Sequence, residues 1–397
     1  MKLTSEEQDM LDGKYGKAAK KSMEILVTLG DIFDAECMVN VYGVQIAGVS
    51  YANLGEAGLE FLNEMAEDGK VRVLTTLNPA GMDRENWQAL GIDEEFAKNQ
   101  NRAIDAFAKM GIITTCSCTP YLIGNSPHYG QHIAWAESSA VCYANSIIGA
   151  RTNREGGPSA LASAITGKTP KYGYHLDENR HGEVLIKVNA PVRGTDKFGI
   201  LGKIIGDKLV EIGKKIPYIT GISNATVEEL KSFCASVATY GGTALFHMEG
   251  ITPEYIKYPK PVDITFEFNQ ADLEKTREEL IDDDLEIDFV SIGCPHASIH
   301  EIEKIASLLK GKKVKKEFWI TTARPTKRIA DEVGYSEIIE DAGAKFAADT
   351  CCVVAPIKGR FKRMMVDSAK ACYYGRAKNK FKVKIGSIEE CVEEAMK

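Results

Sequence analysis

Long apolar segments are absent from this sequence of 397 residues. No apolar run approaches the roughly 18 residues that a helix needs to cross a bilayer. The N-terminal stretch, MKLTSEE, is polar and lacks the apolar core of a secretory signal peptide. Because both features are missing, we expect a cytoplasmic protein that has no contact with a membrane.

An excess of positive charge is absent as well. The chain has 49 Lys and Arg residues against 56 Asp and Glu residues, which gives a formal net charge of −7. Proteins that bind nucleic acids usually carry a basic patch or stripe, whereas Lys and Arg are scattered here. The Lys-rich run 310–316 lies where a helix should end, so we expect no nucleic-acid partner.

The ten cysteines include no Cys-x-x-Cys pair, the spacing that is typical of structural zinc sites. Disulfide frameworks belong mainly to small secreted proteins, and this chain is large and shows no signal peptide. We therefore expect most of the cysteines to be buried thiols, with a few candidates for metal ligands.

Strand and helix patterns alternate along the chain, and this order favours parallel sheets with helices on both faces. We predict an α/β fold in which parallel sheets flanked by helices form two or more lobes around a central cleft. The predicted lobes are residues 1–185 and 186–397. The predicted strands are 37–47, 71–77, 112–116, 183–188, 264–268, 286–292 and 318–322. The predicted helices start with a capping box at Ser5–Gln8 and include 93–110, 131–148, 227–238, 271–280 and 298–309.

Three cysteines follow predicted strands. Cys118 comes after the strand at 112–116, Cys294 after the strand that ends at Ile292, and Cys351 after the short apolar segment 345–348. Ligands of open α/β sheets bind at the carboxyl ends of the strands, so these thiols could meet in one crevice. Three thiolates would leave an iron one open position for a substrate hydroxyl. From spacing alone, three unrelated buried cysteines are the commoner outcome.

Two loops offer backbone amides to an anion. The first, Gly48-Val49-Ser50, lies between a predicted strand and a helix and adds a hydroxyl group. The second, Asn78-Pro79, begins where the strand at 71–77 ends. Amide groups at such positions suit phosphate or carboxylate oxygens, although ordinary turn chemistry explains both loops equally well.

The segment 149–157 is the richest polar cluster of the chain. Its two arginines, Arg151 and Arg154, could each grip a carboxylate or a phosphate with two parallel hydrogen bonds. Glu137 and Glu155 are candidate acid or base groups, or else partners that neutralise these arginines. His296, two residues after Cys294, could supply a hydrogen bond behind a metal ligand or could simply pack.

Several long motifs occur in one order along nearly the whole chain and together resemble the large subunit of the aconitase X family. They are Cys118–Tyr121, Ile133–Val141, Ala144–Gly157, Gly293–His296 and Thr350–Cys351. The resemblance implies an aconitase-like fold. It also implies an iron site held by Cys118, Cys294 and Cys351. The cofactor it implies is an iron–sulfur cluster, 4Fe-4S in the branch that acts on phosphomevalonate, with 2Fe-2S or mononuclear iron as alternatives.

The family contains hydro-lyases that dehydrate 5-phosphomevalonate or cis-3-hydroxy-L-proline. The resemblance implies a lyase that dehydrates (R)-5-phosphomevalonate to an anhydromevalonate phosphate in isoprenoid synthesis, with Gly48–Ser50 and Asn78-Pro79 in contact with this small anionic substrate. It also implies a heterodimer with a small swivelling-domain subunit that carries a catalytic serine, because this chain lacks that domain. The alternatives are a cis-3-hydroxy-L-proline dehydratase, a non-catalytic iron–sulfur scaffold subunit and a hydrolase with a cysteine nucleophile.

Overall fold

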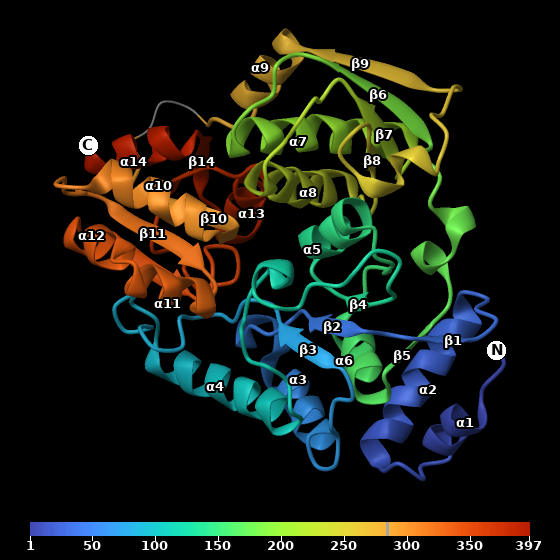
Figure 1. The fold of residues 1–397 in the computed structure, drawn as a ribbon. Helices are drawn as coiled ribbons and strands as arrows, with labels where there is room; N and C mark the ends of the chain where they lie inside the picture. Colours follow the sequence, from blue (N-terminus) through green and yellow to red (C-terminus); the bar gives the residue numbers. More distant parts are fainter. Residues whose placement is uncertain (283–285) are drawn as a thin grey trace.

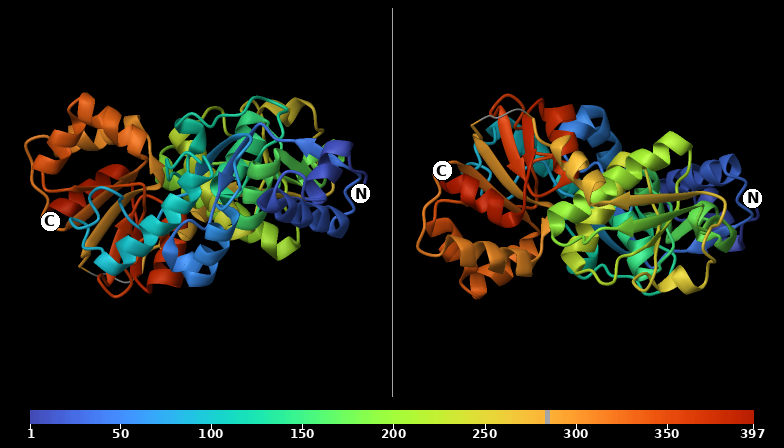
Figure 2. Two further views of the ribbon diagram at one scale, coloured as in Figure 1. Left: turned by 90° about the horizontal axis from the view of Figure 1, so that it is seen from below. Right: turned by 90° about the horizontal axis from the view of Figure 1, so that it is seen from above.

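The computed structural model describes residues 1–282 and 286–397. Its strands form three larger sheets in which neighbouring strands run parallel, and a separate antiparallel pair, β1–β5. Helices pack on these sheets, so the predicted α/β fold is confirmed (Figure 1). The two termini lie at opposite ends of the molecule (Figure 2).

The N-terminal sheet has the order β3–β2–β4, and its apolar residues are covered by helices. Val44 and Ile46 of the central strand belong to a buried cluster with Phe107 of α4 and Leu161 of α6. The strands are β1 (Met38–Asn40), β2 (Gly43–Ile46), β3 (Leu74–Leu77), β4 (Ala134–Trp135) and β5 (Lys168–Pro170). The helices are α1 (Ser5–Leu11), α2 (Lys17–Ile32), α3 (Tyr51–Met65), α4 (Glu94–Lys109), α5 (Ser138–Tyr143) and α6 (Gly157–Thr166).

The middle sheet has the order β8–β7–β6–β9, and the paired helices α7 and α8 lie beneath it in Figure 1. The two helices approach closely because α7 presents glycines to α8. A Cβ atom at Gly202 would lie 2.8 Å from the carbonyl oxygen of Phe233, so no larger residue fits there. The elements are β6 (Val184–Asn189), α7 (Thr195–Ile212), β7 (Pro217–Thr220), α8 (Val227–Gly241), β8 (His247–Met248), β9 (Thr265–Asn269) and α9 (Gln270–Glu278).

The C-terminal sheet has the order β12–β11–β10–β13–β14. Since its strands are parallel, the end of β10 lies at the same edge as the segments that follow β12 and β13. Cys294 was expected after a strand that ends at Ile292, but β10 continues to Ala297 and contains it, with a register shift after Ile292. The strands are β10 (Phe289–Ala297), β11 (Glu317–Thr322), β12 (Lys345–Ala348), β13 (Arg363–Val366) and β14 (Lys382–Ile385). The helices are α10 (Ile299–Leu309), α11 (Arg324–Glu332), α12 (Tyr335–Asp341), α13 (Ala369–Tyr374) and α14 (Ile388–Met396). Single turns are η1 (Pro120–Leu122), η2 (Ala144–Ile148), η3 (Gly173–His175), η4 (Asp177–Asn179), η5 (Pro253–Ile256) and η6 (Gly375–Asn379), of which η2 and η6 are π-helical.

Two predicted elements are wrong. The strand expected at 112–116 is irregular, and within it only Ile113 forms an isolated bridge, to Thr76. The helix expected at 131–148 begins instead as strand β4, because Ala134 and Trp135 pair with β2. Only the second half of that segment is helical, as α5 and η2. Pairing with a distant strand has overridden the local preference of the small residues for helix.

None of the helices in the described residues has the length and apolar character that a bilayer span requires. The division into lobes at residue 185 stays a prediction.

Candidate metal and substrate site

The folded chain gathers Cys118, Cys294 and Cys351 in one buried place. Their side chains belong to residues that are 7%, 8% and 6% exposed. Burial is the main reason why the pKa of each thiol is raised, and neighbouring thiols raise the pKa of Cys118 and Cys294 further. The Cys351 thiol raises the pKa of both Cys118 and Cys294, and the Cys118 thiol raises the pKa of Cys294. The three sulfur atoms therefore lie within electrostatic reach of one another.

His296 joins the three cysteine segments, and it is fully buried. Its backbone N–H donates to Sγ of Cys118 at 3.2 Å, and its Nδ1 lies 3.1 Å from Oγ of Ser117. Its Nε2 lies 3.0 Å from the carbonyl oxygen of Thr350, the residue before Cys351. A carbonyl can only accept, so Nε2 carries the proton and Nδ1 accepts from the serine. Burial lowers the pKa of His296 to about 4, so the ring is neutral at pH 7.

A buried ion pair lies beside the thiols. Nζ of Lys370 donates to Oε1 of Glu137 at 2.5 Å, and Asn78 donates to Oε2 of the same carboxylate at 2.8 Å. Burial opposes the charge on Lys370, but Glu137 and the thiols of Cys294 and Cys118 outweigh it and raise the pKa of the lysine. Burial likewise opposes the charge on Glu137, and Lys370 and Asn78 lower its pKa to about 2. Both groups are thus ionised at neutral pH.

Lys370 was not predicted from the sequence. It follows β13 and lies in the first turn of α13, so it shares the sheet edge with the cysteine segments. Its charge lowers the pKa of each of the three thiols. The signal that could have found it is the same strand-end position that identified Cys294. That signal was missed because the strand Arg363–Val366 was not predicted.

The two predicted substrate loops lie against the segment of Cys351. The backbone N–H of Ala80, in the second loop, donates to the carbonyl oxygen of Asp349 at 2.8 Å. Oγ of Ser50, in the first loop, donates to the carbonyl oxygen of Val354 at 3.4 Å. Asn78 reaches the thiol site through Glu137. The structure therefore brings both loops to the three cysteines.

Gln100 holds the two loops together and was also missed. It is fully buried on α4, where its Oε1 accepts from the N–H groups of Tyr51 and Gly81 at 3.0 and 2.9 Å. Its Nε2 donates to the carbonyl oxygen of Val49 at 2.9 Å. One side chain thus satisfies three backbone groups of the loops. A single amide on the apolar face of the predicted helix 93–110 was the available signal.

Arg324 links the Cys351 segment to the N-terminal region. Its Nη2 lies 2.5 Å from Asp83 and 2.8 Å from Asp349, and both carboxylates are buried. Its Nη1 lies 3.1 Å from Glu85. Asp349 has a left-handed backbone conformation with a φ of 65°, which turns the chain from β12 toward Cys351.

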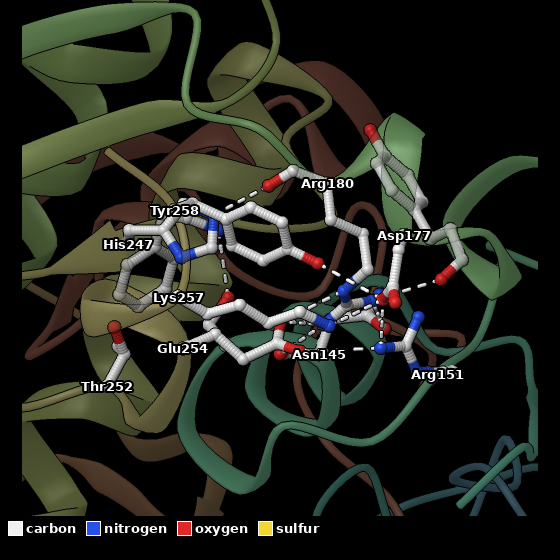
Figure 3. Close-up of polar contacts among 12 residues, drawn as sticks. Asn145, Arg151, Asp177, Arg180, His247, Thr252, Glu254, Lys257 and Tyr258 are labelled. Carbon is white, nitrogen blue, oxygen red and sulfur yellow. Dashed lines mark hydrogen bonds and ion pairs between the residues drawn. The ribbon is translucent and has the colours of Figure 1, made fainter. Parts of the chain in front are cut away.

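Arg151 lies in a different polar network, which Figure 3 shows. It forms ion pairs with Asp177 and Glu254, and Glu254 also accepts from the fully buried Arg180 at 2.7 Å. Figure 3 places Arg180 beside Asn145, to which it donates at 3.2 Å. Among the contacts of the described residues, Arg151 has none with a cysteine segment. Its role in substrate binding stays a prediction.

The other residues of the predicted polar cluster do not join the thiols either. Arg154 is exposed, and no ion pair of its side chain appears in the part of the chain that the structure describes. Glu155 is buried and accepts from Oγ of Ser159 at 2.6 Å. Next to Arg151, His132 and His175 approach each other at 2.9 Å between their Nδ1 atoms.

The described residues contain no group of three His, Cys, Asp or Glu side chains that is arranged to hold a single metal ion. Cys352 is a neighbour of both Cys351 and Cys294. Its own surroundings differ, however, since its thiol pKa responds to Ser291, Asp367 and Cys372. Burial raises the pKa of the Cys116 thiol, and the neighbouring charges of Asp349 and Arg84 also act on it. Cys116 therefore lies near the ion pairs of Arg324.

Family models of the aconitase X first, second and third domains match residues 1–178, 182–278 and 287–397. The chain belongs to the aconitase X family. A crystal structure of aconitase X from Thermococcus kodakaraensis (holo-form) superposes with a TM-score of 0.93 at 45% identity, and the match covers 100% of both chains. The aconitase-like fold is therefore confirmed.

Named aconitase X relatives cover the chain from end to end. It is 46% identical to the phosphomevalonate dehydratase large subunit of Methanocaldococcus jannaschii, over 99% of this chain and 100% of that protein. It is also 46% identical to the protein of the same name from Thermococcus kodakarensis, over 100% of both. The cis-3-hydroxy-L-proline dehydratase of Pseudomonas aeruginosa is 30% identical, and the match covers 100% of this chain but 70% of that protein.

Proposed function

We propose that this aconitase X chain is the large subunit of a hydro-lyase that dehydrates (R)-5-phosphomevalonate. The observation that carries the proposal is the meeting of three remote thiols with the loops of Ser50 and Asn78 around one buried ion pair. The identity of 46% to two phosphomevalonate dehydratase large subunits supports this substrate over hydroxyproline, whose dehydratase is 30% identical.

Cys118, Cys294 and Cys351 are the residues that would hold an iron–sulfur cluster, and we infer the 4Fe-4S form. Thiols are the usual ligands of such clusters, and three of them leave one iron free of protein. When bound, the cluster supplies an open iron that polarises the departing hydroxyl group. We prefer Cys351 to Cys352 because the charge of Lys370 lowers the pKa of Cys351, as it does for Cys118 and Cys294.

The protein residues bind and orient the substrate. Backbone amides of the loops Gly48–Ser50 and Asn78-Pro79 offer hydrogen bonds to carboxylate or phosphate oxygens. In the elimination, a base takes a proton from the carbon next to the carboxylate, the C–H electron pair becomes the new C=C bond, and the hydroxyl leaves the neighbouring carbon as hydroxide. The proton removed and this hydroxide together make up the water that is released. We assign the base to a serine of a small partner subunit, in keeping with the large-subunit names of the relatives.

Replacement of one proposed ligand tests the site. We expect Cys118→Ser, purified without oxygen and reconstituted with iron and sulfide, to lose most of its iron and the dehydration of (R)-5-phosphomevalonate. Cys391→Ser is the matched control, because Cys391 is buried in α14 and away from the thiol group. Iron is measured by a colorimetric assay and turnover with the small subunit present. Unchanged iron in Cys118→Ser contradicts the site, and turnover of cis-3-hydroxy-L-proline alone contradicts the substrate.

A further inference from the structure

The orientation of the Asn78 side-chain amide is fixed by its neighbour. Its Nδ2 donates to Oε2 of Glu137 at 2.8 Å. An ionised carboxylate only accepts hydrogen bonds, so the nitrogen of the amide, and not its oxygen, must face Glu137. Asn78 is only 9% exposed, and its Oδ1 is buried without a hydrogen-bond partner among the described residues. The site therefore presents one buried acceptor that lacks a donor.

Glu137 is itself held in place on all sides. Besides Asn78, it accepts from Nζ of Lys370 at 2.5 Å and from Oγ of Ser139 at 3.1 Å. It is also the N-cap of α5, where it accepts from the N–H of Ser139 at 3.4 Å. The ammonium group of Lys370 and the hydrogen bond from Asn78 keep this buried carboxylate ionised and its pKa at about 2, so it is a weak base at neutral pH. Its geometry suits a fixed anchor and does not suit the acid or base expected from the sequence.

We propose that Lys370 and Glu137 are positioning residues that fix the Asn78 amide, so that its Oδ1 accepts a hydrogen bond from the hydroxyl group of the substrate. This inference rests on the proposed function. The ionised carboxylate and phosphate groups of a phosphorylated hydroxy acid mainly accept hydrogen bonds. Its hydroxyl group is the donor that the unpaired Oδ1 requires. Lys370 thus holds Glu137 in place, and Glu137 holds the Asn78 amide, so that Oδ1 of Asn78 is presented as a hydrogen-bond acceptor.

A fixed acceptor at Oδ1 of Asn78 has a consequence for substrate specificity. A site that is built to bond a hydroxyl group rejects an analogue that cannot donate, because the buried acceptor is left unpaired. Fluorine is about the size of a hydroxyl group but offers no hydrogen. In Glu137→Gln, the new amide can offer its oxygen or its nitrogen to Asn78, so the Asn78 amide is free to turn round. In Lys370→Met, the unpaired buried carboxylate takes up a proton and can likewise donate to Asn78.

The test compares (R)-5-phosphomevalonate with the analogue in which fluorine replaces its hydroxyl group. In the iron-loaded complex with the small subunit, the KM of the substrate and the inhibition constant of the analogue are measured. In the iron-depleted complex, both dissociation constants are measured by titration calorimetry. We expect the preference for the hydroxyl ligand to fall about tenfold in Glu137→Gln and in Lys370→Met. It should be restored in Lys370→Arg, which keeps the charge.

Lys203→Met is the matched control. Lys203 is a buried lysine with two carboxylate partners, Asp207 and Glu279, but it lies on α7 and not beside the thiols. If Lys370→Met does not fold, the double variant Glu137→Gln/Lys370→Met leaves no buried charge unpaired and carries the same expectation. An unchanged preference in variants that still bind the substrate overturns the inference. If the wild-type complex binds neither ligand, the proposed function falls and the inference falls with it.

Discussion

At the scale of single residues, the chemistry of the site depends on side chains that sequence patterns alone do not single out. Cys118, Cys294 and Cys351 were candidates because they follow predicted strands, and the resemblance to aconitase X singled them out as one iron site. Lys370 was missed because the strand before it, Arg363–Val366, was not predicted, so its position at a strand end went unnoticed. Its importance comes from burial beside Glu137 and the thiols, which only the fold creates.

His175 provides a residue-scale test of pH dependence. Burial, helped by His132 and Arg180, lowers its pKa to about 3 from an ordinary value of 6.5. Below pH 6.5 His175 is therefore protonated in the unfolded chain, whereas in the folded chain it is protonated only below about pH 3. Stability is lost as the pH falls through this window. At pH 4.5 we expect His175 to destabilise the fold by about 2 kcal/mol relative to pH 7.

The measurement is urea unfolding of the wild type and of His175→Gln at pH 7 and pH 4.5. The difference in unfolding free energy between the two pH values should be smaller in the variant by about that amount. Equal pH dependence in both proteins would show that His175 takes up its proton equally in the folded and unfolded states.

At the scale of helices and strands, local signals predicted those elements whose ends are capped by their own neighbours. The helix expected at 93–110 is α4, with Asp93 as its N-cap, and the helix expected at 298–309 is α10, with Ser298 and Glu301 in a capping box. The box expected at Ser5–Gln8 is one residue out, since Thr4 and Glu7 form it. Elements that depend on remote pairing, such as β4, could not be predicted in this way.

Gln100 carries an element-scale prediction, because α4 uses it to hold both substrate loops. Gln100→Leu keeps the apolar packing but leaves three buried backbone groups without their partner. We expect a loss of about 2–4 kcal/mol in unfolding free energy and a raised KM from misplaced loops. Asn101→Leu, on the exposed neighbour in the same helix, is the control for helix propensity and added hydrophobicity. Calorimetry measures the stability and steady-state kinetics the KM. A normal KM in a destabilised Gln100→Leu would show that the two loops do not contact the substrate.

At the scale of the whole molecule, two ion pairs join the N-terminal region to helices α11 and α13, which follow strands of the C-terminal sheet. One is Glu137 with Lys370, and the other is Asp83 with Arg324, which also binds Asp349. The parallel sheets with their flanking helices were predictable from the alternation of strand and helix patterns along the sequence, whereas the order of strands within each sheet was not predicted. The pairing between regions was not, because it joins residues more than 200 positions apart.

Arg324→Met tests the second of these links. It leaves the buried carboxylates of Asp83 and Asp349 without a cation, and we expect a loss of about 3–5 kcal/mol in unfolding free energy. Arg328→Met, on an exposed arginine of the same helix, should change stability by less than about 0.5 kcal/mol. Differential scanning calorimetry of both variants provides the comparison. Equal transition temperatures for the two would mean that the ion pairs of Arg324 contribute nothing to stability.

The ring of His296 is hydrogen-bonded to the neighbours of Cys118 and Cys351, and the same residue lies two places after Cys294. Cys118 and Cys351 belong to regions that are far apart in the sequence, so the three thiols meet only after those regions have packed together. Any group that all three thiols would hold must therefore be delivered to a chain that is already largely folded.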